Sequence, residues 1–512
     1  MREDLTSASM AAAWWLPALS AQAQMFVRTA YGLLLLATLV SALPHGRRFF
    51  LSERFGGYAE SDRWRDVVHS AAAYPFLIAT WIGCAVLIVI DRFTVPAALV
   101  NVVLCRHYFI RMRWKGVLRG MGAPGFMTYW LGVAVLLLEV TTRYAPSARP
   151  AALLALQVDL ALIFVSAGVY KVSAGFARND GMELGLANPA WGYWWRRYKD
   201  LPPSHLLLRV LNHLAWSTEI AAAILCLVPA TRTLGGLLLI ATFFFIATQI
   251  RLAFLCEMVM VCGVLYFAPG SGADRFAASI VAPFGDAAIA APAVPDAFPA
   301  LTGLLTAALF GYVALLPIVH AGLYYNFYVR RPLPGGMQRL LDRYANLFGI
   351  IIWRVFTADL VNFLIRIHRQ DRVTGDRVLF SRYGLSGGLR FSHVAESITV
   401  TCVFTTLKYY ASNTALFEQR LLRYARTLPC DGDHLLVFEY VSLVKGPSRF
   451  EFVPAAEYVV DLRDGSVRRT VLRADVSVHA PHAGSPVHEG ATPGSYLPLE
   501  PARAAGGRDS VR

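Results

Sequence analysis

The sequence predicts an α-helical polytopic membrane protein of about nine spans, followed by a small C-terminal α+β domain. Hydrophobic residues make up 56% of the 512 residues and charged residues 16%, whereas a soluble domain usually carries about 25% charged residues. Apolar runs of the length that a bilayer requires recur from residue 26 to residue 324. The chain is expected to divide into an interfacial segment (1–24), a transmembrane domain (25–330), the α+β domain (331–479) and a disordered tail (480–512).

Most of the predicted spans are single apolar runs between polar or basic loops. They cover residues 26–43, 71–90, 93–110, 125–142, 151–170, 211–228 and 301–324. The run 234–267 is too long for one ordinary crossing, and Gln249-Ile250-Arg251 interrupts it near its middle. We interpret it as two short spans, with one long tilted helix as the alternative. The Ala/Pro-rich stretch 276–300 predicts an irregular, re-entrant loop.

Lys and Arg are distributed unevenly between the predicted loops. Loops one, three and five hold most of them, whereas loops two, four and six hold only Arg92, Arg143, Arg149 and Arg232. Positive residues collect on the cytoplasmic side of a membrane, so we expect the N-terminus outside and the C-terminal part in the cytoplasm. The expected location is a bacterial inner (plasma) membrane. The net charge of +14 then reflects basic loops beside anionic lipid, and we expect no nucleic-acid partner.

The part of the chain after Arg330 has the pattern of a small mixed domain. Val361, Phe363, Ile365 and Ile367 alternate with Asn362, Leu364 and Arg366, which predicts a half-buried strand. The turn sequence 371–376 predicts a hairpin with 377–383. Helices are expected over 393–410 and 413–428, and strands over 434–444 and 449–462.

Several kinds of site receive no support from the sequence. It contains no Walker A and no HExxH sequence, which argues against a phosphate-driven pump. The seven cysteines form no CxxC pair and lie mostly in apolar runs, so we expect neither disulfides nor a zinc site. The spacing of His and carboxylate residues suggests no other metal site.

Lys171 is the candidate catalytic base. It ends the fifth predicted span in Ser166-Ala-Gly-Val-Tyr-Lys171, where small residues allow a neighbouring helix to approach closely. A lysine held away from water could act as a general base, and the alternative is a lysine that snorkels to the headgroups. Glu219, two helical turns after Asn212, is expected near Lys171, where it would orient the base or the substrate. Alternatively, Glu219 pairs with Arg251 and holds the bundle together.

The candidate substrate-binding residues are the other polar groups within the apolar runs, because such groups are costly in hydrocarbon. They are Asp159, Gln249, Arg251 and Glu257. Arg251 and Glu257 diverge by roughly 120° on one straight helix, so each is expected to find a partner elsewhere. Asp159 diverges from Lys171 by a similar angle, which favours a structural role facing the bundle.

Several of these residues together resemble a known family. The chain is similar to the horizontally transferred transmembrane (HTTM) domain of vitamin K-dependent gamma-carboxylase-like proteins over roughly residues 25–330. The resemblance rests on Arg28-Thr-Ala-Tyr-Gly32, Ala167-Gly168-Val169-Tyr170-Lys171, Trp191, Glu219, Pro229, Arg232 and the segment centred on Gln249. It implies that Lys171 is the base, that a quinone is the cofactor and that the C-terminal part lies outside the cytoplasm. On this last point we follow the charge distribution of the chain itself.

The chain also departs from the carboxylase pattern. It has Tyr170-Lys171-Val172-Ser173 where the carboxylases have Lys-Lys-Leu-Asp, and Gln249 stands in place of a histidine. Glutamine at that point is similar to the lipase maturation factor branch. Vitamin K-dependent carboxylation of a protein therefore does not carry over to this chain.

These observations predict an HTTM-like membrane protein that modifies or matures a peptide or lipid-linked substrate, with Lys171 as base. The expected partners are the lipid bilayer and a peptide or protein substrate, and the residues themselves identify no cofactor. The alternative is a non-enzymatic maturation or immunity factor, or a component of a transporter. Transport predicts a continuous polar route past Asp159, Glu219, Arg251 and Glu257, whereas an enzyme predicts one closed pocket around Lys171.

Overall fold

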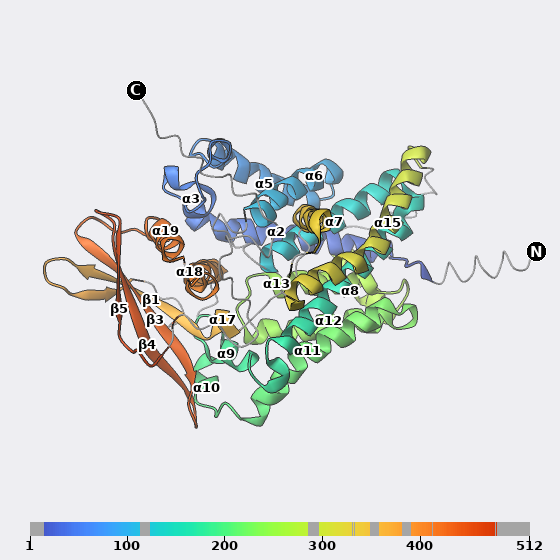
Figure 1. The fold of residues 1–512 in the computed structure, drawn as a ribbon. Coiled ribbons are helices and arrows are strands. Elements are labelled where there is room, and N and C mark those ends of the chain that lie inside the picture. Colours follow the sequence, from blue (N-terminus) through green and yellow to red (C-terminus); the bar gives the residue numbers. More distant parts are fainter. Residues whose placement is uncertain are drawn as a thin grey trace, which may run out of the picture.

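The structure is a computed structural model of the chain. It describes residues 15–112, 123–284, 296–329, 331, 333–348, 358–380, 391–411, 413–476 and 478. The helices form one body and the strands form a sheet at one end of it (Figure 1). The predicted tail 480–512 and most of the predicted interfacial segment 1–24 lie outside the described residues.

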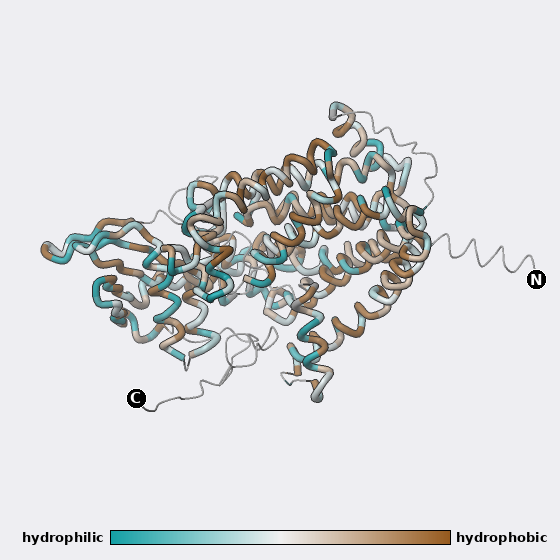
Figure 2. Tube along the Cα trace, turned by 90° about the horizontal axis from the view of Figure 1, so that it is seen from above, coloured by the Kyte–Doolittle hydropathy of each residue, from teal (hydrophilic) through white to brown (hydrophobic). Residues whose placement is uncertain are grey.

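Six helices in the described part of the chain are long and apolar enough to cross a membrane, which indicates an integral membrane protein. They contain α2 (Ala21–Ala42), α7 (Ala123–Tyr144), α8 (Arg149–Ser173), α11 (Leu206–Leu227), α12 (Arg232–Gln249) and α15 (Pro299–Tyr324). Hydrophobic residues run along these helices, whereas hydrophilic residues gather toward the sheet and at helix ends (Figure 2).

Three shorter apolar helices occupy the other predicted spans. They are α5 (Ala73–Val89), α6 (Thr94–Cys105), which continues as a π-helix over Arg106–Arg111, and α13 (Leu255–Gly263). The run 234–267 is broken as expected, because α12 ends at Gln249 and α13 begins at Leu255. The chain reverses between them, with Ala253 at a left-handed φ of 52°, and the two helices pack against each other. The alternative of one long tilted helix is therefore wrong.

Two details of the membrane part differ from the prediction. The first helix begins at Ala21, because the Ser20 hydroxyl accepts a hydrogen bond from the backbone N–H of Ala23 and caps it. The stretch 276–300 is not irregular throughout, since α14 (Gly272–Val281) covers its start and is capped by Ser271. Residues 285–295 of that stretch lie outside the described residues.

The C-terminal part forms a five-stranded antiparallel sheet in the order β2-β1-β3-β4-β5. The strands are β1 (Phe363–Asp371), β2 (Arg377–Leu379), β3 (His434–Lys445), β4 (Phe450–Asp461) and β5 (Ser466–Val471). The predicted hairpin and the strands over 434–444 and 449–462 are confirmed. Three elements of this part were not predicted from the sequence: β5, α16 (Gly335–Phe348) and α17 (Ala358–Val361).

Two helices cover one face of this sheet, α18 (Phe391–Tyr409) and α19 (Thr414–Ala425) (Figure 1). Aromatic side chains form the contact, with Phe404 of α18 and Phe417 of α19 both packed edge-on against the Tyr458 ring of β4. Asn413 caps α19 by accepting from the backbone N–H of Leu416. Both helices were predicted, and they give the sheet the apolar cover that its inward face requires.

The aromatic loop between α9 (Met182–Ala187) and α11 connects the helices to the sheet. Asn188 is fully buried and donates from Nδ2 to the carbonyls of Val361 at 2.7 Å and Phe363 at 2.8 Å. Trp194 of this loop is 47% exposed, as is typical of an aromatic residue at the membrane interface. Trp191, in contrast, is only 6% exposed and packs into the core.

Candidate functional site

Lys171 and Glu219 form a buried ion pair between α8 and α11. Lys171 is 5% exposed and Glu219 2% exposed, so both charges are removed from solvent. Nζ of Lys171 donates to Oε1 of Glu219, whereas Oε2 has no hydrogen-bond partner in the described part of the chain. Glu219 therefore pairs with Lys171, and the alternative pairing with Arg251 is wrong.

The small residues before Lys171 bring the two helices together. A Cβ atom at Gly168 would lie 2.4 Å from Cγ1 of Ile220 and 2.9 Å from the carbonyl oxygen of Trp216, so a larger residue does not fit there. Gly168 of α8 thus lies directly against residues 216–220 of α11, and Lys171 lies one helical turn closer to the C-terminal end of α8. Its amine points back into the bundle to reach Glu219 and does not snorkel toward the headgroups.

Asn212 and Glu219 lie on one buried face of α11, as their spacing predicts. The side chain of Asn212 donates to Oε2 of Glu183 at 2.6 Å and accepts from the backbone N–H of Met182 at 2.8 Å. Glu183 is completely buried and also forms an ion pair with Lys445 at 2.5 Å. One face of α11 thus carries both the Lys171 pair and a polar link to β3.

Lys445 binds two carboxylates at this link. Its Nζ lies 2.6 Å from Oδ1 of Asp180 and 2.5 Å from Oε1 of Glu183. Burial alone lowers the pKa of Lys445, but the carboxylates of Glu183 and Asp180 outweigh that effect and raise it above its ordinary value. Lys445 therefore stays protonated and holds the end of β3 against α9. Glu183 and Lys445 were not predicted from the sequence, because they are far apart in the chain.

Gln249 and Arg251 hold the aromatic loop and do not contact Lys171. Nη1 of Arg251 donates to the carbonyls of Pro189 at 2.9 Å and Gly192 at 3.0 Å, and its guanidinium lies 4.8 Å from the centroid of the Tyr193 ring. Oε1 of Gln249 accepts from the Tyr198 hydroxyl at 2.8 Å. These two candidate binding residues therefore fasten the loop that connects the helices to the sheet.

Asp159 and Glu257 make no contact with Lys171 in the described part of the chain. Oδ2 of Asp159 accepts from Nε1 of Trp130 at 2.8 Å, which links α8 to α7 as a residue facing the bundle. Glu257 lies in the first turn of α13, and its Oε2 is buried without a partner among the described residues. The four predicted binding residues thus do not form one cluster with Lys171.

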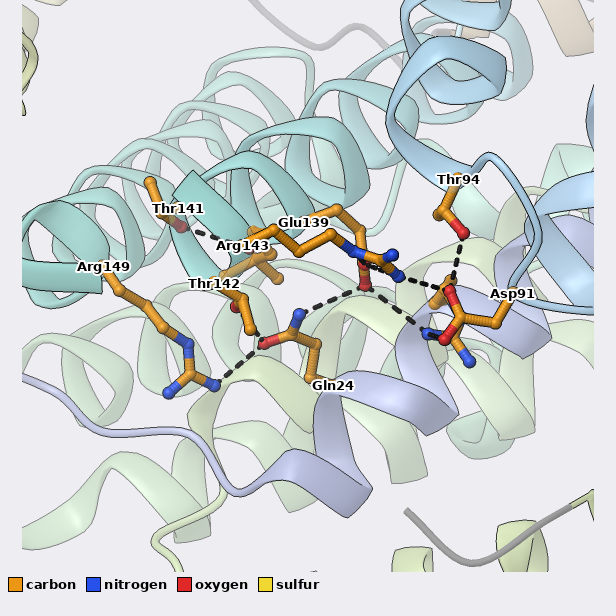
Figure 3. Close-up of polar contacts among 10 residues, drawn as sticks. Gln24, Asp91, Thr94, Glu139, Thr141, Thr142, Arg143 and Arg149 are labelled. Carbon is orange, nitrogen blue, oxygen red and sulfur yellow. Dashed lines mark hydrogen bonds and ion pairs between the residues drawn. The ribbon is translucent and has the colours of Figure 1, made fainter. Parts of the chain in front are cut away.

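A second polar cluster lies at the opposite end of α8, near its first residues (Figure 3). Nη1 of Arg28 lies 2.9 Å from Oδ2 of Asp91, and Arg143 contacts both Asp91 at 2.5 Å and Glu139 at 3.0 Å. Nε2 of Gln24 donates to Oε1 of Glu139 at 3.1 Å. These contacts join α2, α7 and the α5–α6 turn, so the cluster holds this end of the bundle together.

Protein-family models, curated proteins and solved structures gave no match to the chain. The resemblance to the HTTM domain therefore stays a prediction. Burial and pairing mark Lys171 and Glu219 as the candidate site.

Proposed function

We propose that this integral membrane protein is an HTTM-like enzyme that modifies or matures a peptide or lipid-linked substrate, with Lys171 as the base. The observation that supports the proposal is the buried pair of Lys171 and Glu219, whose second carboxylate oxygen has no partner in the described part of the chain. Buried polar atoms nearly always have a hydrogen-bond partner. Because Oε2 of Glu219 has none among the described residues, it is available to a hydrogen-bond donor of the substrate.

The pair can exchange a proton without changing its net charge. Transfer from Nζ of Lys171 to Glu219 leaves a neutral amine beside a neutral carboxylic acid. The amine then takes a proton from the substrate, while the protonated Glu219 can donate a hydrogen bond through its carboxyl group. Shielding from water strengthens these interactions, because the local dielectric constant is lower than in solution.

Substitution of Lys171 tests this proposal. We expect membranes with the Lys171→Met or Lys171→Arg variant to lack a modified lipid or peptide that the unchanged protein produces, since neither side chain is a base at neutral pH. Untargeted mass spectrometry of lipid and peptide extracts measures the amount of this product in membranes that contain equal amounts of each protein. Lys199→Met is the control, because that lysine lies in the loop with its side chain 32% exposed.

Two results would contradict the proposed role. Full product formation by Lys171→Arg would end the base hypothesis, because guanidinium keeps its proton. An unchanged set of masses, with a compound redistributed across the membrane, would instead favour a transporter component.

The proposal includes nine crossings, with α5, α6 and α13 as short spans beside the six long ones. The N-terminus is then outside and the sheet is cytoplasmic, as the distribution of Lys and Arg predicts. We expect a membrane-impermeant maleimide to label Arg92→Cys, in the exposed α5–α6 turn, in intact cells. Asp433→Cys, whose native side chain is 83% exposed, should react only after permeabilisation. The reverse pattern, measured above the background of the unmodified chain, would overturn this topology.

A further inference from the structure

The hydroxyl of Ser166 is directed at a neighbouring helix and not at its own backbone. Ser166 lies in α8 and is completely buried. Its Oγ lies 3.0 Å from Nδ1 of His320 in α15 and accepts a hydrogen bond from the Tyr324 hydroxyl at 2.8 Å. Three side chains from two helices thus meet at one point inside the bundle.

Other hydroxyls in the long apolar helices behave differently. Thr128, Thr141 and Ser217 each donate to the carbonyl four residues earlier, at 2.9, 2.8 and 2.7 Å. This is the usual way in which Ser and Thr satisfy their proton within a helix. Ser166 makes no such bond in the described structure, so its proton is available to His320.

Tyr324 donates to Oγ of Ser166. The Ser166 hydroxyl can then donate its own proton to Nδ1 of His320 in the neutral tautomer whose ring hydrogen lies on Nε2. That nitrogen is buried and has no partner in the described structure, although His320 is only 4% exposed. A buried donor without an acceptor indicates a place for a group that the chain itself does not supply.

We propose that Ser166 and His320 are a nucleophile and its base, and that they cleave an acyl ester of a lipid or lipid-linked molecule. The Ser166 oxygen bonds to the ester carbonyl carbon while its proton passes to Nδ1 of His320. The bond to the alcohol oxygen then breaks, and His320 returns the proton to that oxygen. The products are acyl-Ser166 and a free alcohol. Water then attacks the acyl carbonyl carbon while one of its protons passes to Nδ1 of His320. The bond to the Ser166 oxygen breaks, and His320 returns the proton to that oxygen, which releases the carboxylic acid and restores Ser166.

The surroundings select a substrate from the bilayer. The outer side of α15 is apolar, with Leu301, Leu304 and Ile318 at least 60% exposed, so the pair lies behind a surface that faces lipid. Tyr324 of the same helix is half-buried and hydrogen-bonded to Ser166. Its hydroxyl is the donor closest to Ser166, in a position to stabilise the oxyanion.

This site is independent of the proposed role of Lys171. Residues 166 and 171 diverge by roughly 140° around α8. Ser166 contacts α15, whereas Lys171 contacts Glu219 of α11. Loss of one activity should therefore leave the other unchanged.

A fluorophosphonate with a long alkyl chain tests the proposal, because such reagents modify serines that have an adjacent base. The full-length protein in lipid nanodiscs is treated with the probe, and the adduct is located by mass spectrometry. We expect modification at Ser166, no modification of that position in Ser166→Ala, and a loss of roughly 100-fold or more in labelling rate in His320→Gln. Ser173→Ala, a hydroxyl of the same helix bonded to the carbonyl of Tyr170, is the matched control and should label normally. Lys171→Met should also label normally.

Two outcomes would overturn the proposal. One is the absence of an adduct at Ser166 in the folded, unmodified protein, a result that does not depend on any variant. The other is an undiminished labelling rate in His320→Gln at unchanged thermal stability, which would mean that Ser166 reacts without the imidazole. If His320→Gln fails to fold, the labelling rate of the unmodified protein is measured as a function of pH. A rate that rises with the deprotonation of one imidazole supports the proposal, and a rate independent of pH contradicts it.

Discussion

Replacement of Glu219 by leucine is expected to lower the free energy of unfolding by roughly 3–5 kcal/mol, because it leaves the charge of Lys171 buried without a partner. Lys171 is 5% exposed, so its amine cannot regain its hydration without opening the contact between α8 and α11. Unfolding in detergent micelles, followed by tryptophan fluorescence, measures the change.

A double variant separates the pair from the packing around it. Lys171→Met combined with Glu219→Leu should recover most of the lost stability, since replacing both partners of a buried ion pair by apolar residues is often neutral or stabilising. Asp200→Leu is the control, because its pair with Lys199 is exposed and should change stability by less than about 1 kcal/mol. A small effect of Glu219→Leu together with no recovery in the double variant would contradict the burial of the pair.

Glu183→Ala is expected to have an effect of similar size on the attachment of the sheet. The substitution removes the acceptor of Lys445 at 2.5 Å, of Asn212 at 2.6 Å and of the backbone N–H of Gly181 at 3.0 Å. Loss of a completely buried carboxylate with charged and neutral partners costs roughly 3–5 kcal/mol. Thermal unfolding and the rate of proteolytic cleavage around residues 445–450 measure the loss.

Asp180→Asn is the matched control for this prediction. Asp180 binds the same lysine at 2.6 Å, but its side chain is 31% exposed, so water can replace the contact. We expect a change of less than about 1 kcal/mol and unchanged proteolysis. Equal effects of the two substitutions would show that the link depends on charge alone and not on the buried hydrogen bonds of Glu183.

The sequence predicted the apolar helices well because their signal is local. A run of apolar residues marks each span, and Gln249 with Arg251 marks the break between α12 and α13. The elements that were missed carry weaker signals. The strand β5 lies at the edge of the sheet and carries two adjacent arginines, Arg468 and Arg469, so it lacks the alternation of a half-buried strand. The helix α14 lies in an Ala-rich stretch that resembles a loop.

The polar contacts could be predicted only in part, since they depend on which helices become neighbours. The small residues around Gly168 did indicate a close helix contact, and Lys171 and Glu219 meet across it. Ser166 and His320 come from segments 154 residues apart. Nothing in the local sequence of either segment shows that α8 and α15 pack together, so their contact became visible only in the fold.

The central claim is that the amine of Lys171 is turned into the bundle, away from water. The most direct test is acetylation of the unmodified protein with a water-soluble N-hydroxysuccinimide ester, located by mass spectrometry. We predict rapid acetylation of Lys199, whose side chain is 32% exposed, and none of Lys171 until the protein is unfolded. Acetylation of Lys171 in the folded protein at the rate of Lys199 would contradict the claim.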